Sequence, residues 1–173
     1  LMASTYPLEV VSAARWTKAN PGVTGKALED AMQSQPWDPA VKSLTAFPQV
    51  LEMMNSKLDW TQKLGDAFLA QQKEVMAAVQ TLRLRAETAG NLETGDEQIV
   101  VKEQQGDTTI VKIEPANPDV IYVPTYNPGV VYGTWWYPTA PPYYYYPAGY
   151  AIGLGIAFTG AAFVGAAMWG SSE

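Results

Sequence analysis

Side chains able to perform common enzyme chemistry are scarce in this 173-residue chain. It has no histidine and no cysteine, which removes the most frequent general base, the thiol nucleophile and most transition-metal ligands. No Gly-x-Ser-x-Gly or Ser-x-x-Lys pattern occurs, and Gly22–Lys26 resembles a phosphate loop only in part. The acidic pairs Glu29-Asp30 and Asp96-Glu97 are adjacent and therefore diverge. We predict a protein that is not an enzyme, with no catalytic residue, metal or cofactor.

A second chemical group is a run of aromatic rings and prolines over residues 127–149. So many prolines predict an extended strap rather than a helix. Its rings suit a membrane-interface belt, a stacking platform for sugars or peptides, or packing onto neighbouring subunits. The belt is favoured, because the strap adjoins an apolar run. The expected belt residues are Trp135, Trp136, Tyr143, Tyr144, Tyr145, Tyr146 and, at the far end of the run, Trp169.

The apolar run covers residues 150–169, and no charged residue lies between Asp119 and Glu173. As a helix, such a segment rises about 30 Å, the thickness of a bilayer's hydrocarbon core. A transmembrane-like helix is therefore expected. Small residues recur at every fourth position, a spacing that lets membrane helices pack closely, although a Gly- and Ala-rich composition also produces it by chance. The helix-packing residues would be Gly149, Gly153, Ala157, Ala161 and Gly165.

The run contains few strongly apolar residues, each worth only about −0.3 to −0.6 kcal/mol at the bilayer centre. We therefore predict that several copies enter the lipid bilayer together as a homo-oligomer. No Lys or Arg flanks the run, so neither its orientation nor the choice between inner and outer membrane follows. The net charge of −6 and the dispersed basic residues disfavour nucleic acid as a partner.

The charged remainder, residues 1–126, reads as one α+β body, helical over 1–90 and β over 97–124. Proline and cap residues punctuate its helices. Gln71 and Gln72 interrupt the apolar stripe of the longest helix, either as a polar layer in an oligomer or where the helix leaves its own core. The expected helices run from Pro7 to about Lys18, from the cap Thr24 to before Pro36, from Pro39 after the cap Asp38, from Pro48 to Lys57, and from Asp59 to Ala89, stopped by Gly90.

Alternating apolar residues after Asn91 predict a β-hairpin. Ile99 and Val101 mark the first strand, Gln105-Gly106-Asp107 the turn, and residues 109–113 the returning strand. A third extended stretch, residues 120–123, is bracketed by prolines and suits an edge strand. The body is therefore expected to contain a small antiparallel sheet.

Several short motifs are spread over the charged part of the chain. They are MASTYPLEVV at 2–11, QPWDP at 35–39, VKSL at 41–44, FPQVL at 47–51, KLDWT at 57–61, LGDAF at 64–68, AQQ at 70–72, IEPA at 113–116 and VIYVPTYNP at 120–128. Together these motifs resemble a bacterial envelope family catalogued as domain of unknown function 3300. The resemblance implies exported proteins of Gram-negative bacteria, often with a Gly- and aromatic-rich end, and it supplies no activity. The chain begins at Leu1 without a leader pattern, so a processed or partial chain is expected.

Two functions follow from these features. The first is a structural or pore-forming subunit of a membrane-associated envelope assembly, held together by its C-terminal helices, with the body in the periplasm. The alternative is an envelope binding module whose Trp- and Tyr-rich strap holds a glycan or another envelope protein.

Overall fold

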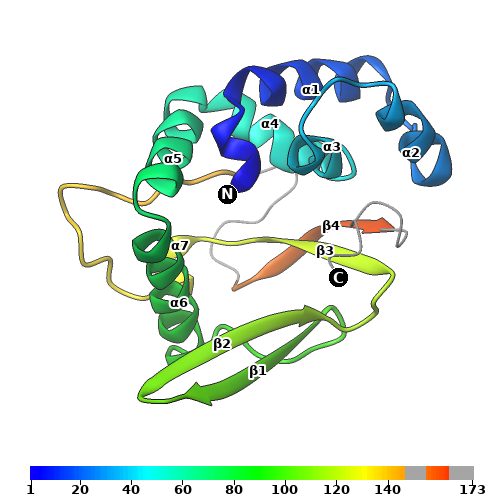
Figure 1. The fold of residues 1–173 in the computed structure, drawn as a ribbon. Helices are drawn as coiled ribbons and strands as arrows, with labels where there is room; N and C mark the ends of the chain where they lie inside the picture. The colour runs from blue at the N-terminus through cyan, green and yellow to red at the C-terminus, as the bar shows by residue number, and fades with distance from the viewer. Residues whose placement is uncertain (147–154, 164–173) are drawn as a thin grey trace. The chain divides into compact units, whose positions relative to one another are not determined.

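The computed structural model describes residues 1–146 and 155–163, with the side chains of the last strand described only through Phe158. The chain divides into two compact units, which are treated separately: unit 1, built on Leu1–Val75, and unit 2, Met76–Ala161. The division falls within one helix. Figure 1 labels the elements within each unit.

Unit 1 is helical. A core of small and medium apolar side chains fills the space between its helices, and Val10, Val41 and Leu51 are fully buried at its centre. Alanines at positions 13 and 14 allow α1 to pack closely on α4. The elements are η1 (Met2–Thr5), α1 (Pro7–Ala19), α2 (Gly25–Gln33), α3 (Pro39–Leu44), α4 (Pro48–Ser56) and α5 (Leu58–Ala70). The four expected helix starts between Pro7 and Pro48 are thus confirmed.

Two hydrogen bonds of Asp38 hold the start of α3 in place in unit 1. The Asp38 carboxylate accepts a hydrogen bond from the Ala40 amide at 2.8 Å, the predicted cap of α3. The Asp38 amide in turn donates to the Glu9 carboxylate of α1 at 2.6 Å. Because Glu9 is distant in sequence, this bond fixes the start of α3 against α1.

Gly65 permits the closest backbone approach in unit 1. A Cβ at this position would lie 2.2 Å from the Ser4 carbonyl oxygen. The missing side chain therefore allows α5 to lie directly against η1, as Figure 1 shows.

The long helix expected over 59–89 is wrong as a single element. α5 ends at Ala70 and α6 (Gln72–Thr88) begins after Gln71, whose φ of −147° and ψ of 56° are not helical. Residues 71–74 are exposed, so the break lies in a stretch without buried side chains. The interruption of the apolar stripe thus marks a break in the backbone.

The end of α6 is confirmed at Gly90. This glycine has a φ of +72°, and its amide bonds the Glu87 carbonyl while the Asn91 amide bonds the Ala86 carbonyl. These two bonds form a Schellman motif, which needs a left-handed residue at the glycine position. The chain is thereby turned away from the helix axis toward the strands.

The predicted hairpin is confirmed as β1 (Gln98–Gln105) and β2 (Thr108–Pro115), antiparallel, with Gln105 opposite Thr108. The two-residue turn places positive φ on Gly106 alone, as a glycine-first turn of type II′ requires. The outer edge of β1 is covered at its base, because the Thr94 hydroxyl accepts from the Val100 amide and the Gly95 amide donates to the Gln98 carbonyl.

β3 (Val120–Thr125) contains the third expected extended stretch, but it pairs with β4 (Ala157–Phe163) in a separate two-stranded sheet. The expectation of a helix over 150–169 is therefore wrong at residues 157–163. Hydrogen bonds to β3 satisfy this backbone in an extended form, and the Phe158 ring meets Tyr122 edge-on at 6.1 Å. Residues 150–154 and 164–169 lie outside the described part. Across the residues that the structure describes, no helix has the length and apolarity needed to cross a membrane.

The strap contains one short helix that the proline content argued against, α7 (Pro128–Val131). The Asn127 side chain accepts from the Gly129 amide at 2.9 Å, and Pro128 occupies the first helical position. This is the same cap pattern as Asp38-Pro39, so the sequence carried a signal for it. The rest of the strap through Tyr146 contains no helix or strand.

Candidate functional site

Unit 2 contains a largely apolar cavity of about 270 Å³, here called the unit 2 cavity. Residues of α6, the hairpin, β3, α7 and the segment before β4 contribute to its wall. Such a cavity with a few polar groups is the usual form of a small-molecule site. Its apolar wall is made by Val79, Leu82, Ala86, Leu92, Ile113, Pro124, Val131 and Ile156, and its polar wall by Arg83, Gln98, Tyr126 and Tyr132.

A pair of tyrosine hydroxyls belongs to this wall. Tyr126 and Tyr132 share one hydrogen bond of 2.6 Å, and their rings meet edge-on at 5.6 Å. Burial raises the pKa of the Tyr132 hydroxyl, and the adjacent Tyr126 raises it further. Tyr132 is therefore neutral at physiological pH and acts as a hydrogen-bonding group without charge.

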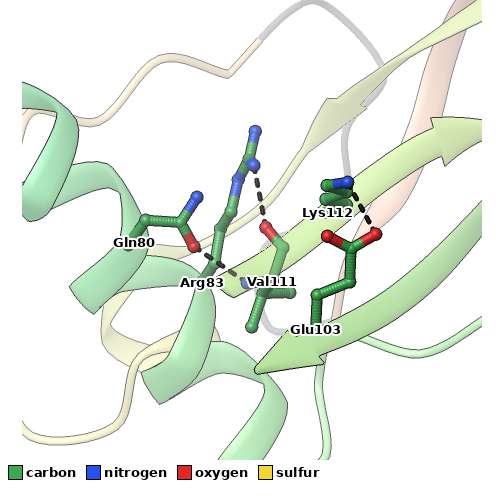
Figure 2. A network of polar contacts seen from close by, with 5 residues as sticks. All are labelled: Gln80, Arg83, Glu103, Val111 and Lys112. Atoms are coloured by element: carbon green, nitrogen blue, oxygen red, sulfur yellow. Dashed lines mark hydrogen bonds and ion pairs between the residues drawn. The ribbon is translucent and has the colours of Figure 1, made fainter. Parts of the chain in front are cut away.

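Helix α6 contributes two polar side chains one turn apart that bind the edge of β2. The Val111 amide donates to Gln80 Oε1 at 2.9 Å, and Arg83 Nη1 donates to the Val111 carbonyl at 3.0 Å (Figure 2). Val111 lies opposite Lys102 of β1. In an antiparallel ladder, the backbone groups of every second residue pair point away from the partner strand. The bonds to Gln80 and Arg83 show that Val111 belongs to such a pair. The helix thus satisfies the outward-facing amide and carbonyl of Val111, and these bonds fix Arg83 in the cavity wall.

Two ion pairs belong to the hairpin. Lys112 bonds Glu103 at 2.6 Å across the two strands, and this bond lowers the pKa of the Glu103 carboxyl (Figure 2). Lys102 bonds Glu87 of α6 at 2.5 Å. Both lysines are therefore neutralised by carboxylates within unit 2.

The strap, which belongs to unit 2, packs against the end of α6 through Trp136. The Arg85 guanidinium lies 3.6 Å from the centre of the Trp136 ring, and the Trp135 and Trp136 rings are 4.6 Å apart. The Trp135 indole donates to the Ala140 carbonyl at 2.8 Å. The Asn91 side chain donates to the carbonyls of Val130 and Val131, which holds α7 beside the end of α6.

The expected belt residues thus have different environments. Trp135 and Trp136 are partly buried against their own unit, whereas Tyr144 is 44% exposed and its ring lies 6.1 Å from that of Tyr146. Tyr143 and Tyr145 are partly buried, and Trp169 lies outside the described residues. A role of these rings at a membrane interface stays a prediction.

The expected helix-packing residues are not brought together as a helix face. Ala157 and Ala161 belong to β4, and Gly149, Gly153 and Gly165 lie outside the described residues. The predicted lipid bilayer, homo-oligomer and glycan or protein partners stay predictions, as do the envelope location and the lack of enzymatic activity. Within residues 1–146 and the described end of the chain, no group of three or more acidic side chains could hold a metal ion.

Sequence reasoning missed the cavity and the residues that carry it. No sequence motif singles out Gln80 or Arg83. The i, i+3 spacing of Gln80 and Arg83 places them on one helix face, a signal that was readable. The pairing of Tyr126 with Tyr132 had no such signal, because it depends on the turn formed by α7.

Comparison with known proteins agrees with the motif resemblance. A relative from Escherichia coli (strain K12), "Uncharacterized protein YacH", is 40% identical over an alignment that covers 94% of this chain and 33% of the relative. The chain thus spans about a third of that protein's length. No solved structure matches. The model of the family described as "Protein of unknown function (DUF3300)" matches residues 1–173, and the chain therefore belongs to this family.

Proposed function

We propose that this protein is a non-enzymatic binding module of the bacterial envelope and that unit 2 binds a small, mostly apolar ligand. The observation that carries the proposal is the unit 2 cavity, an apolar space of about 270 Å³ with hydrogen-bonding groups in part of its wall. Apolar surface gains free energy when it leaves water, and the few polar groups can orient a ligand.

The way the cavity wall is held supports this proposal. Gln80 and Arg83 attach α6 to β2, and Asn91 attaches α7 to the end of α6. These bonds join the elements that line the cavity. A pre-formed cavity binds more tightly than one that must be ordered by its ligand, because less conformational entropy is lost.

In this proposal the strap forms part of the cavity wall, whereas the sequence predicted a membrane-interface belt or a stacking platform. Tyr132 lies in the strap and lines the cavity, whereas Trp136 already contacts Arg85 and Trp135. The strap therefore acts as a wall of the site through its first residues. The membrane-assembly function required a helix over 150–169, and the strand at residues 157–163 removes that basis for it.

A neutral probe tests the proposal. In the full 173-residue chain, 1-octanol should shift the amide resonances of cavity residues such as Ala86 and Val131 in two-dimensional NMR. Ala86, only 2% exposed, lines the cavity, so Ala86→Leu should fill it and abolish these shifts. Ala78→Leu adds the same side chain at an exposed position of α6 and should leave binding unchanged. A lack of shifts in the unmodified chain would contradict the proposal.

A further inference from the structure

We propose that the ligand of the unit 2 cavity is a small amphiphilic carboxylate, a single hydrocarbon chain with one anionic head group. The hydrocarbon chain would lie among the apolar residues, and Arg83 with the Tyr126–Tyr132 pair would hold the head group. This inference rests on the proposed function and adds the chemical class of the ligand.

The first argument is the charge of Arg83. Unit 2 has four basic side chains; Lys102 and Lys112 are paired with carboxylates, and Arg85 lies over Trp136. Arg83 has no carboxylate within 4.0 Å among the described residues, although unit 2 is rich in acidic side chains. A cation in the wall of an apolar cavity attracts an anion more strongly than one in open water, because screening is weaker there.

The second argument is the number of hydrogen-bond donors that remain. Arg83 uses one N–H for the Val111 carbonyl, and a guanidinium has five. Tyr126 and Tyr132 carry two hydroxyl protons but share a single bond, so one proton has no acceptor in the part of the chain that the structure describes. The polar wall thus offers several donors to an acceptor-rich head group.

The type of anion follows from the same groups. The planar guanidinium matches the two oxygens of a carboxylate, with which it forms parallel hydrogen bonds. A single arginine balances one negative charge, as a carboxylate carries, but only part of the charge of a phosphate monoester. The arrangement therefore favours a carboxylate.

The size of the cavity limits the hydrocarbon chain. An apolar protein cavity of about 150 Å³ takes up benzene. In proportion, the 270 Å³ of the unit 2 cavity suits a ligand of about ten non-hydrogen atoms. Octanoate has this size and serves as the probe.

The experiment compares octanoate, 1-octanol and octylammonium, all below their aggregation concentrations, with the full chain at pH 7 and low salt. Amide shifts of cavity residues in NMR titrations give each dissociation constant. Octanoate should bind about tenfold or more tightly than octylammonium, and more tightly than 1-octanol. Added salt should weaken octanoate binding and leave 1-octanol binding nearly unchanged.

Variants separate the charge of Arg83 from its structural role. Arg83→Gln should reduce octanoate affinity to that of 1-octanol, whereas Arg83→Lys, which keeps the charge, should retain part of the difference. Tyr126→Phe removes one hydroxyl and should weaken octanoate more than 1-octanol. Because Arg83→Gln also loses the bond to Val111, its 1-octanol affinity reports whether the cavity still forms.

The outcomes distinguish the two proposals. If 1-octanol binds in the cavity but octanoate binds no more tightly than octylammonium, the carboxylate inference is overturned and the proposed function stands. If none of the three probes shifts the cavity resonances, both fail. Tighter octanoate binding that persists unchanged in both Arg83→Gln and Tyr126→Phe would also overturn the assigned head-group contacts.

Discussion

Each of the two units contains a hollow. The two hollows differ in charge and apolarity, and this difference makes the one in unit 2 the better candidate for a binding site. The hollow of unit 1, about 440 Å³, lies between η1 and α5 and is lined by Asp59, Asp66 and Lys63 among other residues. Two aspartates and one lysine line it, so their charges offset one another only in part and leave a net charge of −1, which disfavours an anionic ligand. The unit 2 cavity is smaller and more apolar, and among the described residues that line it Arg83 is the single charged one. Volume alone is thus a poor guide to function.

The largest effect is expected at the backbone contact of unit 1. Gly65→Ala places a methyl group 2.2 Å from the Ser4 carbonyl oxygen, so α5 and η1 must separate. We expect a loss of about 3 kcal/mol or more in the free energy of unfolding, measured by urea titration with far-ultraviolet circular dichroism. Gly95→Ala, where the new Cβ meets its nearest atom at 3.6 Å, should change stability by no more than about 0.5 kcal/mol. Equal stability of the two variants would disprove the close approach.

The second effect concerns the attachment of α6 to β2. Gln80→Leu removes the acceptor of the Val111 amide and leaves it unpaired, at a cost of about 1–3 kcal/mol. Hydrogen exchange of the Val111 amide should accelerate accordingly. Gln72→Leu changes an exposed residue of the same helix and is the matched control. Unchanged protection of Val111 in the Gln80 variant would show that α6 does not hold this edge.

The third effect is the contribution of the Tyr132 hydroxyl of unit 2 to the dependence of stability on alkaline pH. Below about pH 10 the Tyr132 hydroxyl is protonated in both the folded and unfolded chain. Above that pH the unfolded chain releases the proton while the raised pKa keeps it in the folded chain, so stability falls by at most about 1.4 kcal/mol per pH unit.

Urea titrations between pH 8 and 11 check this prediction. Tyr132→Phe should give a shallower fall than the unmodified chain. Tyr137→Phe, whose ring is 56% exposed, should keep the original slope. Identical slopes in all three proteins would place the Tyr132 hydroxyl in water instead of in the cavity wall.

The smallest effect is expected on the strap. Arg85→Gln removes the cation over Trp136 and should destabilise unit 2 by about 0.5–1 kcal/mol, since Arg85 is an exposed residue. Arg85→Lys should recover part of this loss. Tryptophan fluorescence during unfolding measures it. A loss of several kcal/mol would mean that the strap, and not α6, is the main support of the cavity.

The sequence was sufficient where local rules decide the structure. Asp38-Pro39, Gly90 and Gly106 each fix a cap or turn through their own backbone preferences, and all three predictions are confirmed. The helix expected through residues 157–163 failed because apolar composition does not distinguish a membrane helix from a strand that finds a partner. Only the pairing with β3, more than thirty residues earlier in the chain, makes that choice.

The candidate site was less accessible from the sequence. No sequence motif singles out Arg83 or Tyr132. Their role in the candidate site depends on the fold, which places both in the wall of one cavity. The Asn127-Pro128 cap shows an intermediate case: the local signal was present, but the surrounding prolines and aromatic residues obscured it.

The bonds at both edges of the hairpin have a consequence for its motion. Val100 is held by Thr94 on one edge, and Val111 is held by Gln80 and Arg83 on the other. Toward Gly106, the outward backbone groups of β1 and β2 have no such side-chain bonds among the described residues. The hairpin should therefore open from its turn toward its base, with amide exchange slowing residue by residue as the cavity wall is approached. The last part to open is the part that forms the cavity wall, so thermal fluctuations of the hairpin tip leave that wall in place.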